Sequence, residues 1–76
     1  MQQNLTKQSA DLEITVNGER TRTTVQSLDE LLVTLDLTDA MVATALNETF
    51  VPRGRRAATR LSSGDRIEIL APRQGG

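Results

Sequence analysis

The sequence ends in Gly75-Gly76, and the terminal carboxylate on this pair is the group best suited to chemistry. Glycine has no Cβ, so a Gly-Gly end can enter a narrow channel that excludes bulkier residues. Such a tail suits an enzyme that must reach the terminal carbonyl carbon. We expect Gly76 to be the reacting residue, and Gly75, Gln74 and Arg73 to contact the partner that receives the tail. Taken alone the motif is weak, because small residues are common at chain termini.

The rest of the chain is poor in groups that catalyse reactions. Its 76 residues include no cysteine and no histidine, which excludes thiolate nucleophiles, disulfides, thiolate zinc sites and imidazole proton transfer. Phe50 is the single aromatic residue, so little rigid material is available for a small-molecule pocket. We therefore expect a protein that is not an enzyme and that binds neither a cofactor nor a metal.

The overall charge offers no long-range attraction to nucleic acid or to an anionic membrane. Nine basic and ten acidic residues give a net charge of -1, whereas such partners attract a positively charged surface. No segment approaches the ~20 apolar residues of a membrane span, and the N-terminus lacks the pattern of a secretory signal. These features predict a cytoplasmic protein whose partners are selected by local surface contacts.

A second group of charged side chains forms an irregular basic stretch. It contains Arg53, Arg55, Arg56 and Arg60. Because charge runs are usually solvated, we favour a solvent-exposed connection over a specific anion site. Arg53 and Arg73 are nevertheless candidates for pairing with acidic groups of a partner.

Phe50, Val51 and Leu70 are the candidate docking surface. Leu70 alternates away from Ile67 and Ile69, and an exposed apolar patch commonly marks an interface. Phe50 has a competing interpretation as a core residue. We favour the core by about two to one for Phe50, because so small a domain has few large apolar side chains.

All of these groups must be positioned by one small domain. Residues 1–10 are polar and show no periodicity, so we predict a flexible leader. Residues 11–70 form the folded domain. Residues 71–76 form a flexible tail, because Pro72 cannot donate to a sheet hydrogen bond. Six extended residues reach about 20 Å, which is enough to enter another protein.

The domain is predicted to open with a β-hairpin and to continue into a helix. Leu12, Ile14 and Val16 alternate onto one face, and Asn17-Gly18 is a strong turn signal before a returning strand at residues 20–25.

The helix is predicted from a capping box and an apolar stripe. The Ser27 hydroxyl is placed to accept from the Glu30 amide, and the Glu30 side chain to accept from the Ser27 amide. An apolar stripe over about three turns is assigned to the core. Its members are Leu28, Leu31, Leu32 and Leu35.

Three further strands are predicted in the second half of the chain. Residues 41–46 are apolar apart from Thr44 and indicate an interior strand. Asn47-Glu48 is predicted to turn into a short extended piece at residues 49–52, although it lacks the glycine that a type I′ turn prefers. After a turn at residues 62–65, residues 66–70 alternate and form the closing strand.

This order of elements predicts an α+β domain. We expect a mixed sheet of four to five strands packed on one main helix, with a right-handed crossover where strands are parallel. That arrangement is the β-grasp, or ubiquitin-like, fold.

With these elements in place, the chain resembles the ubiquitin-like sulfur carriers, most closely the ThiS type of thiamine biosynthesis. The resemblance spans about residues 12–76 and leaves out the leader. It is carried by the order and spacing of several short segments across the domain. These are residues 14–19 (ITVNGE), 27–32 (SLDELL), 42–47 (VATALN), 51–53 (VPR), 59–61 (TRL), 64–70 (GDRIEIL) and Gly75-Gly76.

The resemblance implies a protein cosubstrate. In this family an E1-like adenylyltransferase uses Mg-ATP to convert the terminal carboxylate, here that of Gly76, into an acyl adenylate. A sulfur donor, such as a cysteine desulfurase or another persulfide protein, then displaces AMP and leaves a thiocarboxylate (1-thioglycine) on Gly76. Thiazole synthase takes this sulfur into the thiamine thiazole. By the same resemblance, magnesium and ATP belong to the partner enzyme.

Two departures and three alternatives accompany this resemblance. The family usually has an aromatic residue where residues 55–58 read Arg-Arg-Ala-Ala, and its members commonly lack the leader. The alternatives are a molybdopterin-synthase-type sulfur carrier, a non-covalent β-grasp interaction module and a modifier that forms isopeptide bonds. A residue added after Gly76 would abolish carrier function but would be tolerated by the non-covalent module.

Overall fold

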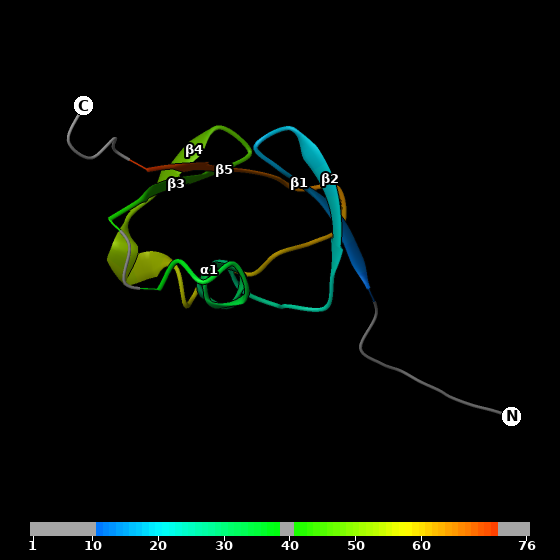
Figure 1. The fold of residues 1–76 in the computed structure, drawn as a ribbon, viewed down its shortest axis with the longest axis horizontal. Helices are drawn as coiled ribbons and strands as arrows, with labels where there is room; N and C mark the ends of the chain where they lie inside the picture. Colours follow the sequence, from blue (N-terminus) through cyan, green and yellow to red (C-terminus); the bar gives the residue numbers. More distant parts are fainter. Residues whose placement is uncertain (1–10, 39–40, 72–76) are drawn as a thin grey trace, which may run out of the picture.

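The computed structural model describes residues 11–38 and 41–71, which form a five-stranded mixed sheet with one helix on one of its faces (Figure 1). The strands are β1 (Leu12–Val16), β2 (Glu19–Thr23), β3 (Ala43–Leu46), β4 (Thr49–Val51) and β5 (Arg66–Leu70). Their order in the sheet is β2-β1-β5-β3-β4, so β5 is central. It runs parallel to β1 and antiparallel to β3. The predicted α+β class is confirmed.

Both hairpins turn through two residues with positive φ. These are Asn17 (52°), Gly18 (84°), Asn47 (50°) and Glu48 (74°). A type I′ turn requires positive φ at both central positions, so both predicted turns are confirmed. The second turn lacks glycine, but the Asn47 side chain ties it to the first residue of β5. Its Oδ1 accepts from the Arg66 amide at 2.9 Å.

The helix α1 (Leu28–Thr34) begins with half of the predicted capping box. The Ser27 Oγ accepts from the Glu30 amide at 3.2 Å, as predicted. The second half of the prediction is wrong, because the Glu30 carboxylate accepts from the Gln26 amide at 2.8 Å instead of from Ser27. The chain before the helix is extended, and Ser27 forms an isolated antiparallel β-bridge with Arg60. That pairing uses the Gln26 carbonyl, which accepts from Leu61, and leaves the Gln26 amide available to Glu30.

The helix is shorter than the leucine stripe predicted. Asp36 adopts a φ of 63°, and Leu37 donates its amide to the Leu32 carbonyl at 2.8 Å. This closes the helix in the manner of a Schellman motif. Leu35 is the C-cap and is 40% exposed, so its assignment to the core was wrong. The other three leucines of the stripe are buried.

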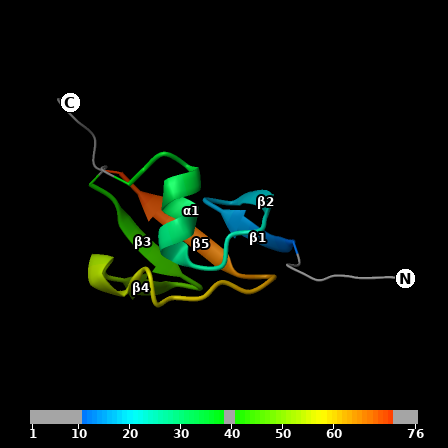
Figure 2. The same ribbon diagram turned by 90° about the horizontal axis from the view of Figure 1, so that it is seen from below.

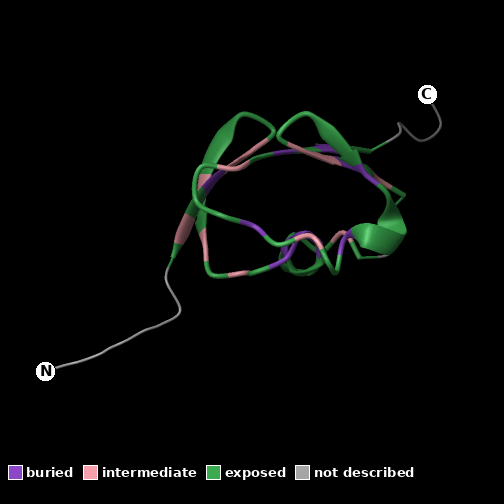
Figure 3. Ribbon diagram, turned by 180° about the vertical axis from the view of Figure 1, so that it is seen from behind, coloured by how far each residue is buried: buried purple, intermediate pink, exposed green. Residues whose placement is uncertain are grey.

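The core lies between α1 and the facing side of the sheet (Figures 2 and 3). Alternation along β5 buries Ile67 and Ile69, as predicted, and leaves its other side chains exposed. The buried apolar residues are Ile14, Leu28, Leu31, Leu32, Val51, Leu61, Ile67 and Ile69. Thr44 shares this layer and is 1% exposed. The opposite face of the sheet is uncovered in the part of the chain that the structure describes (Figure 1).

Candidate functional site

The residues predicted to carry the chemistry lie beyond the described part of the chain. Gly76, Gly75, Gln74 and Arg73 are outside the described residues, as are Pro72 and the predicted leader at residues 1–10. What the structure describes is the base of the tail, where β5 ends at Leu70 and is followed by the exposed Ala71. The site is therefore built from the elements that hold β5 and from the surface around its end.

Asn17 holds the last part of β5 from the β1 side. The pairing of β1 with β5 reaches only Val16↔Ile67, because the first hairpin turns at Asn17. The Asn17 side chain extends this ladder. Its Oδ1 accepts from the Ile69 amide at 2.8 Å, and its Nδ2 donates to the Ile69 carbonyl at 3.1 Å. On the other side β3 pairs with β5 as far as Ala43↔Leu70, so the tail starts from a point held on both sides.

Phe50 and Leu70 are exposed together on the sheet face opposite α1. They are 64% and 68% exposed, respectively. With Ala43, Ala45 and other residues they line a shallow hollow of about 80 Å³. The favoured assignment of Phe50 to the core is therefore wrong. The pair Phe50 and Leu70 is called the outer patch below.

Val51, the third member of the predicted docking surface, lies in the core. It is 7% exposed and pairs with Thr44 across the β3–β4 ladder. Successive strand residues face opposite sides of a sheet, so only one of Phe50 and Val51 can face the core. The Thr44↔Val51 register gives that position to Val51. Its placement on a docking surface was wrong.

The basic stretch is exposed except at Arg56. Arg53 and Arg55 belong to a 3-10 turn, η2 (Arg53–Arg55), and are exposed, as predicted. Arg56 is 6% exposed, so the prediction of a solvated side chain is wrong there. Its Nε donates to Thr44 Oγ1 at 3.2 Å and its Nη2 to the Val42 carbonyl at 2.7 Å. Acceptors on and beside β3 compensate the buried guanidinium for lost water.

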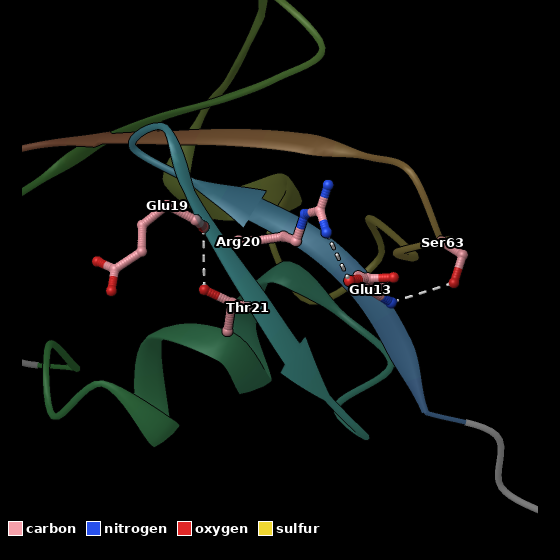
Figure 4. A network of polar contacts seen from close by, with 5 residues as sticks. All are labelled: Glu13, Glu19, Arg20, Thr21 and Ser63. Atoms are coloured by element: carbon pink, nitrogen blue, oxygen red, sulfur yellow. Dashed lines mark hydrogen bonds and ion pairs between the residues drawn. The ribbon is translucent and has the colours of Figure 1, made fainter.

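The polar contacts at the first hairpin do not form a reactive site. Arg20 lies 3.7 Å from a Glu13 carboxylate oxygen, and the Glu13 amide donates to Ser63 Oγ at 3.1 Å (Figure 4). The side chains of this ion pair are 82% and 50% exposed, and such pairs contribute little. Glu19 points away from Glu13, so the two carboxylates do not act as a pair (Figure 4). Within residues 11–38 and 41–71, no cluster of acidic side chains could hold a metal ion.

No helix within residues 11–38 and 41–71 has the length and apolar character needed to cross a membrane.

A sequence profile of the ThiS family matches residues 6–76. The chain belongs to the ThiS family. It is thus a ThiS-like sulfur carrier, and the resemblance predicted from its sequence is confirmed. The match begins at residue 6, earlier than the start at about residue 12 expected from the resemblance.

A solved ThiS structure is similar to the whole described fold. The crystal structure of a thiamine biosynthesis protein (ThiS) from Geobacter metallireducens is 33% identical to this chain, with a TM-score of 0.69. The alignment covers 86% of this chain and 100% of that chain. The predicted β-grasp fold is therefore confirmed. No curated protein matches the chain.

Two residues of this ThiS-family chain have roles that its sequence did not reveal. Asn17 was recognised only as a turn residue, and its bonds to Ile69 join positions 52 apart. Arg56 lies in the segment where the family was expected to carry an aromatic residue. The sequence signal for a polar contact there was Thr44, the one polar residue in the apolar run at residues 41–46, whose hydroxyl accepts from Arg56.

Proposed function

We propose that this ThiS-family chain carries sulfur as a thiocarboxylate on Gly76. The observation that supports this most directly is the extent of the family match, which runs through residue 76 and so includes Gly75-Gly76. The contacts that fix the end of β5 support this proposal as well. A fixed β5 end presents a short reactive segment to a partner in a reproducible direction. The chain is then a protein cosubstrate and not an enzyme.

The carboxylate must be activated before sulfur can be added. It is an anion at neutral pH, and its carbon is a poor electrophile. An E1-like adenylyltransferase with Mg-ATP removes this obstacle: a Gly76 oxygen attacks the α-phosphorus, pyrophosphate leaves, and an acyl adenylate forms. A sulfur nucleophile then forms a C–S bond as the bond to AMP breaks. A persulfide donor additionally requires a thiol to cleave its S–S bond and release the thiocarboxylate.

The same proposal assigns the remaining chemistry to partners. A cysteine desulfurase or another persulfide protein supplies the sulfur, and thiazole synthase consumes it for the thiamine thiazole. The similar chain from Geobacter metallireducens is a thiamine biosynthesis protein, and this likeness supports thiazole as the acceptor. The chain binds no cofactor of its own and acts in the cytoplasm, where persulfides and thiols are maintained.

The outer patch is the surface proposed to dock these partners. Phe50 and Leu70 are large, apolar and exposed, and Leu70 is one residue from the start of the tail. Exposed apolar patches commonly mark protein interfaces. A partner bound to this patch would have its own reactive site within reach of Gly76, because the tail begins directly after Leu70.

The test is the intact mass after incubation with Mg-ATP, the adenylating enzyme and a sulfide or persulfide source. We expect a gain equal to the exchange of one carboxylate oxygen for sulfur. The matched control adds one serine after Gly76, which leaves the described fold unchanged and moves the carboxylate. Conversion of neither protein, while a second carrier is converted, would favour a non-covalent interaction module. Conversion of both proteins would show that the reaction does not require Gly76 at the terminus. Transfer of the sulfur to a molybdopterin precursor in place of a thiazole precursor would favour the other carrier type.

A further inference from the structure

An open groove lies beside the base of the tail and shares Leu70 with the outer patch. It has a volume of about 540 Å³ and Ala71 forms part of its wall. Its other lining residues are Met41, Val42, Ala43, Leu70, Arg53 and Arg56. Phe50 is not among them. The groove is lined from three segments: the start of β3 with the two residues before it, the end of β5, and the η2 turn with Arg56 after it.

The apolar part of this groove is left uncovered by the described domain. Met41 precedes β3 and is 76% exposed, and Leu70 at the end of β5 is 68% exposed. The Ala43↔Leu70 pairing fixes the position of Leu70 relative to β3. Two large apolar side chains exposed beside one cavity offer an apolar side chain of another protein a surface to bury.

The cationic part of the groove has no carboxylate partner among the described residues. The ion pairs in residues 11–38 and 41–71 involve Arg20 and Arg66, and neither lines the groove. Arg56 is 6% exposed, and its acceptors within the described ranges are neutral: the Thr44 hydroxyl and the Val42 carbonyl. Arg53 is exposed at the same groove. Two neighbouring guanidiniums therefore create a site of positive potential that a carboxylate would complement.

We propose that this groove receives a segment of the adenylating enzyme in which an apolar side chain stands next to an aspartate or glutamate. The apolar side chain contacts Met41 and Leu70, and the carboxylate pairs with Arg53, supported by the charge of Arg56. This inference rests on the proposed function. The choice of partner follows from the position of the groove next to Ala71. The five residues after Ala71 reach at most about 18 Å. An enzyme that acts on Gly76 therefore covers the surface next to Ala71.

The test compares Arg53→Glu with Arg55→Glu. Both arginines are exposed and lie in the same η2 turn, and only Arg53 lines the groove. The two variants change the net charge equally, so a general electrostatic effect is the same in both. Pyrophosphate release from Mg-ATP by the adenylating enzyme, with a sulfide source present for turnover, is measured against carrier concentration. Thermal unfolding checks that each variant is folded.

We expect Arg53→Glu to raise KM at least about tenfold with kcat within about twofold, because the lost contact serves docking and not the transfer step. Arg55→Glu should change KM by less than about threefold. Met41→Asp, which alters the apolar side of the groove without touching the outer patch, should also raise KM. The KM of the unchanged protein should increase with salt concentration, and Arg53→Glu should weaken that dependence.

Other outcomes overturn the inference. Equal KM values for Arg53→Glu and Arg55→Glu, with the unchanged protein still converted, refute the groove and leave the proposed function intact. A lower KM for Arg53→Glu would mean that Arg53 holds the chain's own tail carboxylate. A loss confined to kcat would place Arg53 in the transfer step. If the unchanged protein is not adenylated by an enzyme that is active on another carrier, the proposed function itself fails.

Discussion

Arg56→Met is the substitution that tests the described core most directly. It removes a guanidinium that is 6% exposed, donates to Thr44 Oγ1 at 3.2 Å and donates to the Val42 carbonyl at 2.7 Å. Methionine retains an unbranched apolar stem and lacks the charge and the donors. The exposed neighbour Arg55, at the end of η2, provides the matched control as Arg55→Met.

The expected magnitude follows from these two contacts. Hydrogen bonds to charged groups are worth about 1.5–3 kcal/mol each, so both together set a ceiling of roughly 3–6 kcal/mol. Two effects reduce this loss. Removing a buried cation relieves its desolvation cost, and Val42 is only half-buried, so water can reach its carbonyl. We therefore expect a net loss of about 2–3 kcal/mol in the free energy of unfolding.

Urea unfolding followed by circular dichroism measures this loss at equilibrium. Thermal unfolding gives a second measure, because each 1 kcal/mol lowers Tm by roughly 4–8 °C for a domain of this size. Arg55→Met should lie within about 0.5 kcal/mol of the unchanged protein. Arg56→Met should therefore be clearly resolved from Arg55→Met. A variant as stable as the unchanged protein would refute the reasoning. The desolvation cost of Arg56 would then equal or exceed the value of its contacts.

A double-mutant cycle separates one contact from the other. Thr44→Val removes the acceptor of Arg56 Nε together with the bond from Thr44 Oγ1 to the Val51 carbonyl. The double variant should lose less stability than the sum of the single variants, with a coupling of at least about 0.5 kcal/mol. Additive losses would mean that the contact of Thr44 with Arg56 contributes nothing to stability.

Two further outcomes follow from the side chains that hold β5 and α1. Asn17→Gly keeps the positive φ of the hairpin turn and removes both bonds to Ile69, so the Ile69 amide should exchange with deuterium about tenfold faster by NMR; unchanged exchange would show that Asn17 does not hold the base of the tail. Ser27→Ala removes the N-cap acceptor of α1 and should cost about 1 kcal/mol in urea unfolding, whereas Ser62→Ala, at an exposed position, should change little; equal losses would contradict the capping role.

The elements predicted correctly depend on interactions between close neighbours in the chain. Asn17-Gly18 specifies its own turn, and the Ser27 cap reaches an amide three residues away. Alternation along residues 66–70 places its two isoleucines in the core whatever strand lies beside them. Local patterns of this kind also predicted the mixed sheet, because the order of elements leaves few ways to cover one helix.

The errors arose where a partner strand decides the outcome. Phe50 and Val51 necessarily face opposite sides, but only the Thr44↔Val51 register determines which of them is buried. Arg56 is buried because Thr44 and the Val42 carbonyl, 12 and 14 positions away, supply acceptors. Composition and periodicity contain no information about either pairing. The expectation that a basic stretch is solvated therefore holds for Arg53 and Arg55 and fails at Arg56, whose acceptors lie in the core layer.

The two surfaces beside the tail can be distinguished because they share only part of their residues. Leu70 belongs both to the outer patch and to the groove, so a substitution there affects either interface. Phe50 lies only on the outer patch, and Arg53 lies only in the groove. Both surfaces meet at the end of β5, within reach of the tail. If a partner uses both surfaces, substitutions at Phe50 and at Arg53 must each weaken its binding independently. If a partner uses a single surface, its binding is weakened by substitution of Leu70 and of either Phe50 or Arg53, but not of both.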